Sequence, residues 1–319
     1  MTSNMDVSDE FWQACLRMRK ELAEMEAKLV PALGPISDKI EEFYHSIKLP
    51  DGHEAKLKIW RPRELSSEAP LVVLFHGGGY FAGSLEMCTR PGREYAEDFG
   101  AVVVSAAYRL GPEHAFPGSV HDGLDIITWL DQHAEAEFGA NLDRGLVIGG
   151  FSAGGTLTSV TAQQLNCKLK HKIRGHFIAI PWLFTKEIVP EKYQHLWKSR
   201  QKVDGQFVFQ QQANETLEKL EHVLGLHVHD PIFSPVNHKD GLSGQPRTYI
   251  QVGGKDALTD EGVIYAKLLE DAGVEVKIDS HADLGHECFS IFSGNDAPPE
   301  LKNKSMAGMA WLLGKEWQA

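Results

Sequence analysis

A regular alternation of short apolar runs with helix-like stretches, from residue 55 to residue 278, is the feature that most constrains the fold. The apolar runs are residues 71–75, 101–107, 146–149, 177–180, 248–252 and 274–278. Continuous runs of β-branched residues indicate strands that are covered on both faces, as in a parallel sheet. The helix-like stretches are residues 86–99, 120–133, 153–165, 259–272 and, after the last strand, 300–317. This alternation predicts an α/β fold with a mostly parallel, twisted central sheet flanked by helices.

Two segments fall outside the alternation. Residues 9–30 place apolar side chains at helical spacing among charges, which predicts an amphipathic helix, and we expect a second short helix at residues 40–43. Residues 186–230 contain no run typical of a buried strand and are too long for a simple loop. We therefore predict one domain over residues 1–319, with a core of 46–185 and 231–319 and a helical cap formed by 1–45 and the insertion 186–230.

Charge and composition exclude several classes of function. The 32 Lys and Arg residues against 44 Asp and Glu residues give a net charge of −12, and no basic run stands out. Such a chain is not expected to bind nucleic acid or an anionic membrane surface. It also lacks a signal-peptide pattern and an apolar run of roughly 18 residues, so we predict a cytoplasmic protein without stable membrane association.

The cysteines and histidines do not form a recognisable metal site. Cys15, Cys88, Cys167 and Cys288 are widely spaced, which indicates neither a zinc motif nor a disulfide framework and favours a reducing compartment. They are expected to be small core residues. The run 227–230 (HVHD) contains metal-binding residue types, but no further ligand cluster lies near it in the sequence. We predict no metal.

The strongest local motif is Gly150-Phe151-Ser152-Ala153-Gly154, which follows one predicted strand and precedes a predicted helix. In this context a G-x-S-x-G sequence indicates a sharp turn that lifts a nucleophilic serine off the end of the strand. Flanking glycines allow the close packing that such a turn requires. The alternative is an ordinary strand-to-helix turn built of small residues.

A second motif, His76-Gly77-Gly78-Gly79, directly follows the run 71–75. Successive glycines can direct backbone N–H groups to one point, as an oxyanion hole requires. A flexible turn and a weak phosphate loop are the alternatives. The phosphate-loop alternative fails, because this segment has neither the glycine spacing nor the Lys-Ser/Thr pair of a phosphate loop.

A serine nucleophile needs a base that is oriented by an acid, and after such a turn both follow the serine in the chain. Asp256 comes directly after the strand 248–252 and a glycine break, which suits the acid. Asp260 and Glu261 fall where a helix begins and are expected to cap its N-terminus.

Two histidines follow the last predicted strand and are candidates for the base. His286 follows Gly285 in an expected loop and precedes an apolar turn, so we favour it over His281.

Taken together, these motifs resemble those of the hormone-sensitive-lipase-like family of α/β-hydrolases, over most of residues 55–317. The matching stretches are HGGGY at 76–80, YRLGPEH at 108–114, GGFSAGG at 149–155, DPIFSP at 230–235, DALTDEG at 256–262 and the loop at His286. The resemblance implies the α/β-hydrolase fold with a helical cap, a triad of Ser152, Asp256 and His286, and an oxyanion hole formed by the N–H groups of Gly77, Gly78 and Ala153. It implies scaffolding, not chemistry, for residues 108–114.

The sequence departs from the family pattern at four points. Phe151 replaces an acidic residue beside the nucleophile, Gly111 replaces an alanine, and Ala257 replaces the proline that often follows the acid. The segment between His286 and Phe289 is one residue longer than in the family's common pattern. None of these changes removes a catalytic atom.

The resulting hypothesis is a serine carboxylesterase that hydrolyses small to medium esters through an acyl-enzyme intermediate, without a cofactor. Its partner is a small-molecule ester or acyl substrate, and a homodimer is compatible with the resemblance. We expect an apolar substrate pocket lined by Tyr80, Phe81, Phe151 and Trp182. The alternatives are a triad-dependent acyltransferase or cyclase in small-molecule metabolism, an amidase or lactonase, and a non-catalytic small-molecule-binding module.

Overall fold

The computed structural model describes residues 9–165, 167–201, 223, 225, 227–286 and 298–318. These residues form an eight-stranded sheet with the order β1-β2-β4-β3-β5-β6-β7-β8. The strands are β1 Ile40–Lys48, β2 Glu54–Pro62, β3 Leu71–Phe75, β4 Val102–Ala106, β5 Leu146–Phe151, β6 Ile173–Ala179, β7 Arg247–Gly253 and β8 Val276–His281. β1 pairs antiparallel with β2, and β2 with β4, whereas all other pairs are parallel. The predicted mostly parallel α/β sheet is confirmed.

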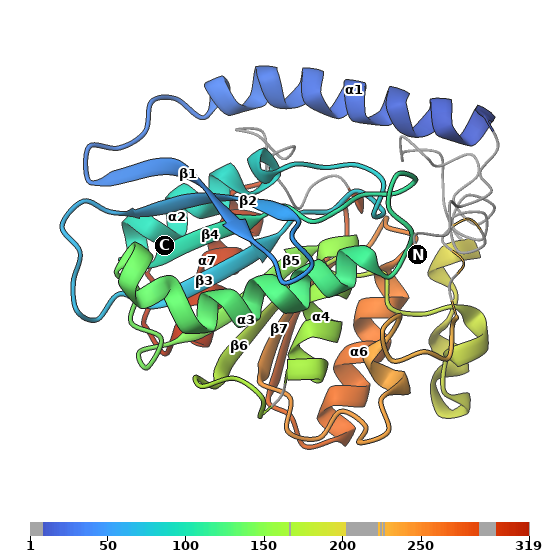
Figure 1. Cartoon of the computed structure of the whole chain (residues 1–319). Coiled ribbons are helices and arrows are strands. Elements are labelled where there is room, and N and C mark those ends of the chain that lie inside the picture. The colour runs from blue at the N-terminus through green and yellow to red at the C-terminus, as the bar shows by residue number, and fades with distance from the viewer. Residues whose placement is uncertain are drawn as a thin grey trace.

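Helices cover both faces of the sheet (Figure 1). They are α2 Thr89–Phe99, α3 Gly118–Phe138, α4 Ala153–Leu165, α6 Thr259–Asp271 and α7 Pro299–Leu313. Val72 of β3 belongs to the same apolar cluster as Tyr95 of α2 and Met309 of α7. Its neighbour Val73 belongs to a second cluster, with Leu157 of α4 and Ile127 of α3. Adjacent strand residues thus face opposite helical layers, which is why the sequence of β3 is apolar throughout.

The first helix, α1 (Asp9–Ala32), lies across the outside of this core (Figure 1). The described start of the predicted insertion forms three 3₁₀ turns, Lys186–Ile188, Glu191–Leu196 and Ser199–Gln201. Residues 202–222, 224 and 226 of the insertion lie outside the described residues. The division into core and cap therefore stays a prediction. No helix within the described ranges is long and apolar enough to cross a membrane.

The helix that we expected at residues 40–43 is wrong, because these residues belong to strand β1. Pairing with β2 runs from Ile40, opposite Pro62, to Lys48, opposite Glu54. Tertiary pairing overrides a weak local preference here, and burial of Ile40 adds to it. Residues 40–45, which we had expected in the cap, are thus part of the central sheet.

Candidate active site

The turn between β5 and α4 holds Ser152 in a strained conformation. Its φ angle is +54°, in the left-handed region that side chains other than glycine rarely adopt. A Cβ atom on Gly150 would lie 2.3 Å from the carbonyl oxygen of Gly154, and one on Gly154 would lie 2.2 Å from that of Phe75. The glycines therefore permit the close packing that keeps the serine at the end of the strand.

The three residues predicted for the triad lie together. The Nε2 atom of His286 is 2.7 Å from the Oγ atom of Ser152, and its Nδ1 atom is 2.9 Å from Oδ2 of Asp256. The Asp256 side chain is fully buried, and its other oxygen accepts a hydrogen bond of 2.9 Å from the backbone N–H of Leu258. His281 lies at the end of β8, where its Nε2 atom is 3.4 Å from the side-chain nitrogen of Gln251. The geometry therefore pairs His286, and not His281, with the serine.

The glycine-rich loop after β3 packs directly against the nucleophile. A Cβ atom on Gly77 would lie 3.2 Å from Cβ of Ser152, so the absence of a side chain lets this loop lie close beside the serine. Gly78 has a φ of +117°, and a Cβ atom there would lie 2.2 Å from the carbonyl oxygen of Ala82. Ala153 is the first residue of α4, where the helix dipole favours negative charge. This arrangement suits the stabilisation of an oxyanion.

His76, which precedes the glycines, supports this loop from inside the core. Its Nδ1 atom lies 2.7 Å from the carbonyl oxygen of Gly77, and its ring stacks on Tyr108 at 4.4 Å. The Tyr108 hydroxyl donates a 2.8 Å hydrogen bond to the carbonyl oxygen of His76. Burial lowers the pKa of His76 to about 4, so the ring is neutral near pH 7. The sequence showed this histidine only as part of a motif and indicated no role for its side chain.

The first turn of α6 attaches the loop of the catalytic acid to the insertion. Oδ2 of Asp260 accepts a hydrogen bond from the backbone N–H of Ser199. Glu261 is fully buried, with Oε2 accepting from the N–H of Phe184 at 2.8 Å and Oε1 from Nη2 of Arg200 at 2.8 Å. Burial raises the pKa of Glu261 to about 7, and Arg200 acts against that shift. Both carboxylates lie in the first turn of α6, as expected, where the helix dipole favours negative charge. Their hydrogen bonds, however, come from backbone and side-chain donors outside the helix.

The four residues predicted to line the substrate pocket are all buried, namely Tyr80, Phe81, Phe151 and Trp182. Phe81 packs edge-on against Phe11 of α1 at 5.1 Å, and Phe151 against Phe177 of β6 at 6.3 Å. The aromatic side chain that replaces the family's acidic residue thus joins the apolar core. Contact of these four residues with substrate stays a prediction.

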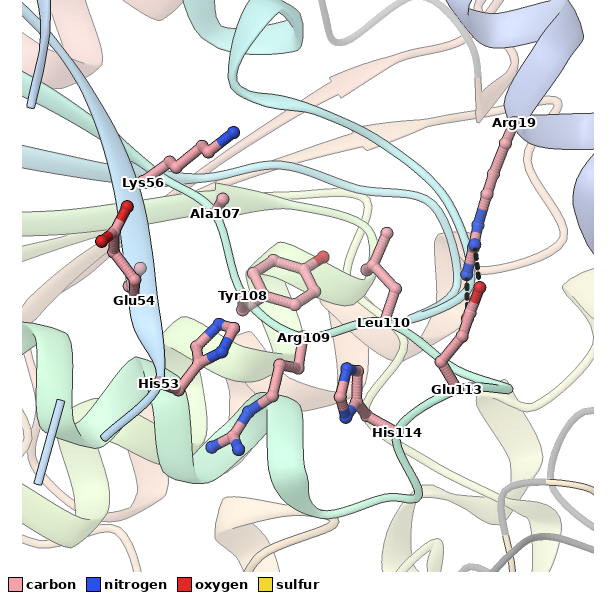
Figure 2. A pocket seen from close by; sticks show the side chains of 11 residues that line it. Arg19, His53, Glu54, Lys56, Ala107, Tyr108, Arg109, Leu110, Glu113 and His114 are labelled. Carbon is pink, nitrogen blue, oxygen red and sulfur yellow. Dashed lines mark hydrogen bonds and ion pairs between the residues drawn. The ribbon is translucent and has the colours of Figure 1, made fainter. Parts of the chain in front are cut away.

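A pocket of about 400 Å³ opens beside residues 108–114 (Figure 2). Among the described residues that line it are Arg19, His53, Lys56, Arg109, Glu113 and His114, and none of the three triad residues. Its two arginines are already paired, Arg19 with Glu113 and Arg109 with Asp51 and Asp122. We therefore do not assign the chemistry to this pocket.

The described residues contain no group of three or more His, Cys, Asp or Glu side chains that could hold a metal ion. His229, from the run with metal-binding residue types, instead lies 2.8 Å from Glu187. Burial raises the pKa of the Cys15 thiol to about 11 and that of Cys88 to about 12, so neither is a ready nucleophile. Cys15 and Cys88 are buried as predicted, whereas Cys167 is exposed, so the core position expected for it is wrong. Cys288 lies outside the described residues.

Several known proteins resemble this chain in sequence and in fold. The chain is 29% identical to esterase LipI of Mycobacterium tuberculosis, over 77% of this chain and 74% of that protein. It is 30% identical to an ethyl acetate hydrolase of Pseudomonas putida, over 73% of this chain and 71% of that protein. Its fold matches the crystal structure of vibralactone cyclase with a TM-score of 0.84 and 23% identity, over 98% of this chain and 97% of that one. Residues 72–290 match the model of an α/β-hydrolase-fold family, and the chain belongs to this family.

Proposed function

We infer that this chain is a serine carboxylic-ester hydrolase that acts on small to medium esters. The observation that carries this proposal is the continuous hydrogen-bonded series from Ser152 through His286 to the buried Asp256. A serine hydroxyl is a weak nucleophile, and this arrangement is the one that activates it. Two relatives, an esterase and an ethyl acetate hydrolase, support the ester as substrate class.

In the first half of the proposed reaction, Ser152 Oγ attacks the ester carbonyl carbon while Nε2 of His286 accepts the hydroxyl proton. The carboxylate of Asp256 keeps the Nδ1–H tautomer of His286 and stabilises the imidazolium. Backbone N–H groups of Gly77, Gly78 and Ala153 stabilise the negative oxygen of the tetrahedral intermediate. His286 then gives the proton to the leaving alcohol, and an acyl-serine remains.

In the second half, water replaces the alcohol. His286 removes a proton from the water, hydroxide attacks the acyl carbonyl, and Ser152 leaves with the proton that returns from Nε2. The acid product is released and the free serine is restored. Apart from the ester and the water, every group that takes part in these reaction steps belongs to the chain.

A p-nitrophenyl ester series of increasing acyl length tests the proposal. We expect turnover of the shorter esters by the wild-type protein, and Ser152→Ala should lower kcat by about 10⁴-fold or more. An unchanged melting temperature in the variant would show that the loss is chemical. Turnover that persists in Ser152→Ala, or a wild-type protein inactive on the whole series, would contradict the proposal.

The acyl acceptor is decided by the mass of the product. After hydrolysis, the summed mass of the acid and alcohol products exceeds the mass of the substrate by one water. Transfer to a hydroxyl or amine within the substrate gives a ring and the leaving alcohol, whose summed mass equals that of the substrate. Parallel assays with amides and lactones separate an esterase from an amidase or lactonase. We propose water as the acceptor. A cytoplasmic location and a homodimer stay predictions.

A further inference from the structure

The cap helix α1 reaches the loop of the oxyanion hole through one arginine. The Nε–H of Arg19 donates a 2.6 Å hydrogen bond to the carbonyl oxygen of Phe81, and its Nη2 donates to the carbonyl oxygen of Gly111. The two terminal nitrogens also bind the two oxygens of Glu113, at 2.6 and 2.7 Å. Figure 2 shows this pair at the edge of the pocket, with Arg19 extending from α1. A single planar group therefore holds two backbone carbonyls and one carboxylate.

The two carbonyls belong to a short hydrogen-bonded circuit that includes an oxyanion glycine. The N–H of Phe81 donates a 3.0 Å hydrogen bond to the carbonyl oxygen of Gly78. The N–H of Gly111 donates a 2.8 Å bond to the carbonyl oxygen of Tyr80. Arg19 closes the circuit by binding the carbonyl oxygens of both Phe81 and Gly111. Displacement of its guanidinium would therefore loosen the turn 78–82, which begins at the proposed oxyanion donor Gly78.

Docking of α1 does not depend on this arginine alone. Phe11 packs edge-on against Phe81 at 5.1 Å, and Cys15 is buried in the main apolar cluster. Farther along the helix, the hydroxyl of Ser84 donates a 2.8 Å hydrogen bond to Glu26. Contacts before and after Arg19 thus hold the helix, so replacement of Arg19 should leave α1 in place while it releases the turn.

We propose that Arg19 is a positioning residue for the oxyanion hole, and that Glu113 orients it. The proposal rests on the proposed function and adds that the cap helix fixes the turn behind Gly78. A guanidinium is suited to this because its donors form a rigid planar fork, whereas the ammonium of lysine is a point charge on a flexible stem. The segment 108–114, expected to be scaffolding, would thus act on the reaction through Glu113.

The test compares Arg19→Met with Arg17→Met, a matched change at an exposed position of the same helix. With a short p-nitrophenyl ester, Arg19→Met should lower kcat about 10-fold and leave KM within about twofold, since loss of a whole oxyanion donor costs about 100-fold or more. Arg19→Lys should restore little of the rate. Arg17→Met should retain the wild-type kcat and KM.

A pair of inhibitors distinguishes positioning of the oxyanion hole from a general structural role. A trifluoromethyl ketone forms an oxyanion with Ser152, whereas the matched methyl ketone binds in its ground state. In Arg19→Met, affinity for the first should fall by about the same factor as kcat, and affinity for the second should not change. Glu113→Gln keeps the donors of Arg19 and should give a smaller loss of kcat and of affinity for the trifluoromethyl ketone. This variant replaces Arg19→Met in the test if Arg19→Met does not fold.

Two results would overturn this inference. One is an Arg19→Met enzyme with wild-type kcat and wild-type affinity for the trifluoromethyl ketone. The other is an equal loss of affinity for both ketones, which would place Arg19 in substrate binding or cap docking. A wild-type protein without esterase turnover would instead contradict the proposed function, so the two failures are distinguishable.

Discussion

Two buried histidines contribute to the response of this protein's stability to acid. Burial lowers the pKa of His76 to about 4 and that of His176 to about 3. In the unfolded chain both side chains would titrate near 6.5. Below that pH these two side chains bind protons in the unfolded state but not in the folded state, so their contribution to stability falls as pH decreases from about 6.5 toward 4.

Replacement of His176 isolates one of these contributions. His176 lies on β6, is fully buried, and its ring nitrogens have no hydrogen-bond partner among the described residues. The free energy of unfolding should decrease between pH 7.5 and pH 5.0 in both proteins. In His176→Leu this decrease should be smaller than in the wild type by about 2 kcal/mol. Urea unfolding at both pH values measures this difference. A matched His121→Leu change, at an exposed position, should not alter it, and an equal effect of both changes would contradict the argument.

Gly78 tests the shape of the oxyanion turn at a single residue. Gly78→Ala places a Cβ atom 2.2 Å from a backbone carbonyl, so the turn must shift, and kcat should fall about 100-fold or more. Gly100→Ala is the control, because Gly100 also has a positive φ but a Cβ atom there would meet no other atom within 4 Å. The control should cost about 1 kcal/mol in stability and keep its kcat. Equal kcat values for the two variants would contradict the assigned role of the turn.

At the scale of elements, the buried pair of Arg200 and Glu261 joins the insertion to the helix that follows the catalytic acid. Both side chains are buried, and Arg200 also donates a 2.7 Å hydrogen bond to the carbonyl oxygen of Phe184. Removal of one partner leaves the other buried without its hydrogen-bonding counterpart, which typically costs about 3–5 kcal/mol, whereas joint replacement by apolar groups costs much less.

A double-mutant cycle measures this connection. Arg200→Met should lower the free energy of unfolding by about 3 kcal/mol, and the Arg200→Met/Glu261→Leu double variant should be more stable than Arg200→Met alone. Chemical unfolding of the four proteins gives the coupling energy. The surface pair of Lys20 and Glu24, treated identically, should give less than about 1 kcal/mol. Additive effects at Arg200 and Glu261 would show that the two side chains do not stabilise each other.

The elements also show how far sequence alone could predict this structure. The fully buried strands and the helices between them follow from apolar runs, because a parallel strand is covered on both faces. β1 escaped prediction because its residues 40–43 (IEEF) suit a helix as well as a strand, and only pairing with β2 decides between the two. The roles of Arg19, Asp260 and Glu261 depend on partners 60 or more positions away, which no local pattern indicates.

At the scale of the whole molecule, the sheet topology explains why the triad residues were nevertheless identifiable. Ser152, Asp256 and His286 follow β5, β7 and β8, and Gly77 follows β3. These strands are parallel members of one sheet, so their carboxyl ends meet at a common edge. Each residue also carried a local signal, a glycine motif or a position directly after a strand. The residues predicted to line the substrate pocket carried no comparable signal, because the lining of a pocket depends on how distant segments pack and not on a local motif.

Covalent labelling is the most direct test of the central claim that Ser152 is the nucleophile of a triad at this edge. Incubation with a fluorophosphonate, followed by intact-mass and peptide analysis, should show one adduct per chain, on the peptide that contains Ser152. The Ser152→Ala variant should remain unlabelled, and His286→Gln should react far more slowly than the wild type. An adduct on another residue, or labelling that persists in Ser152→Ala, would contradict the account.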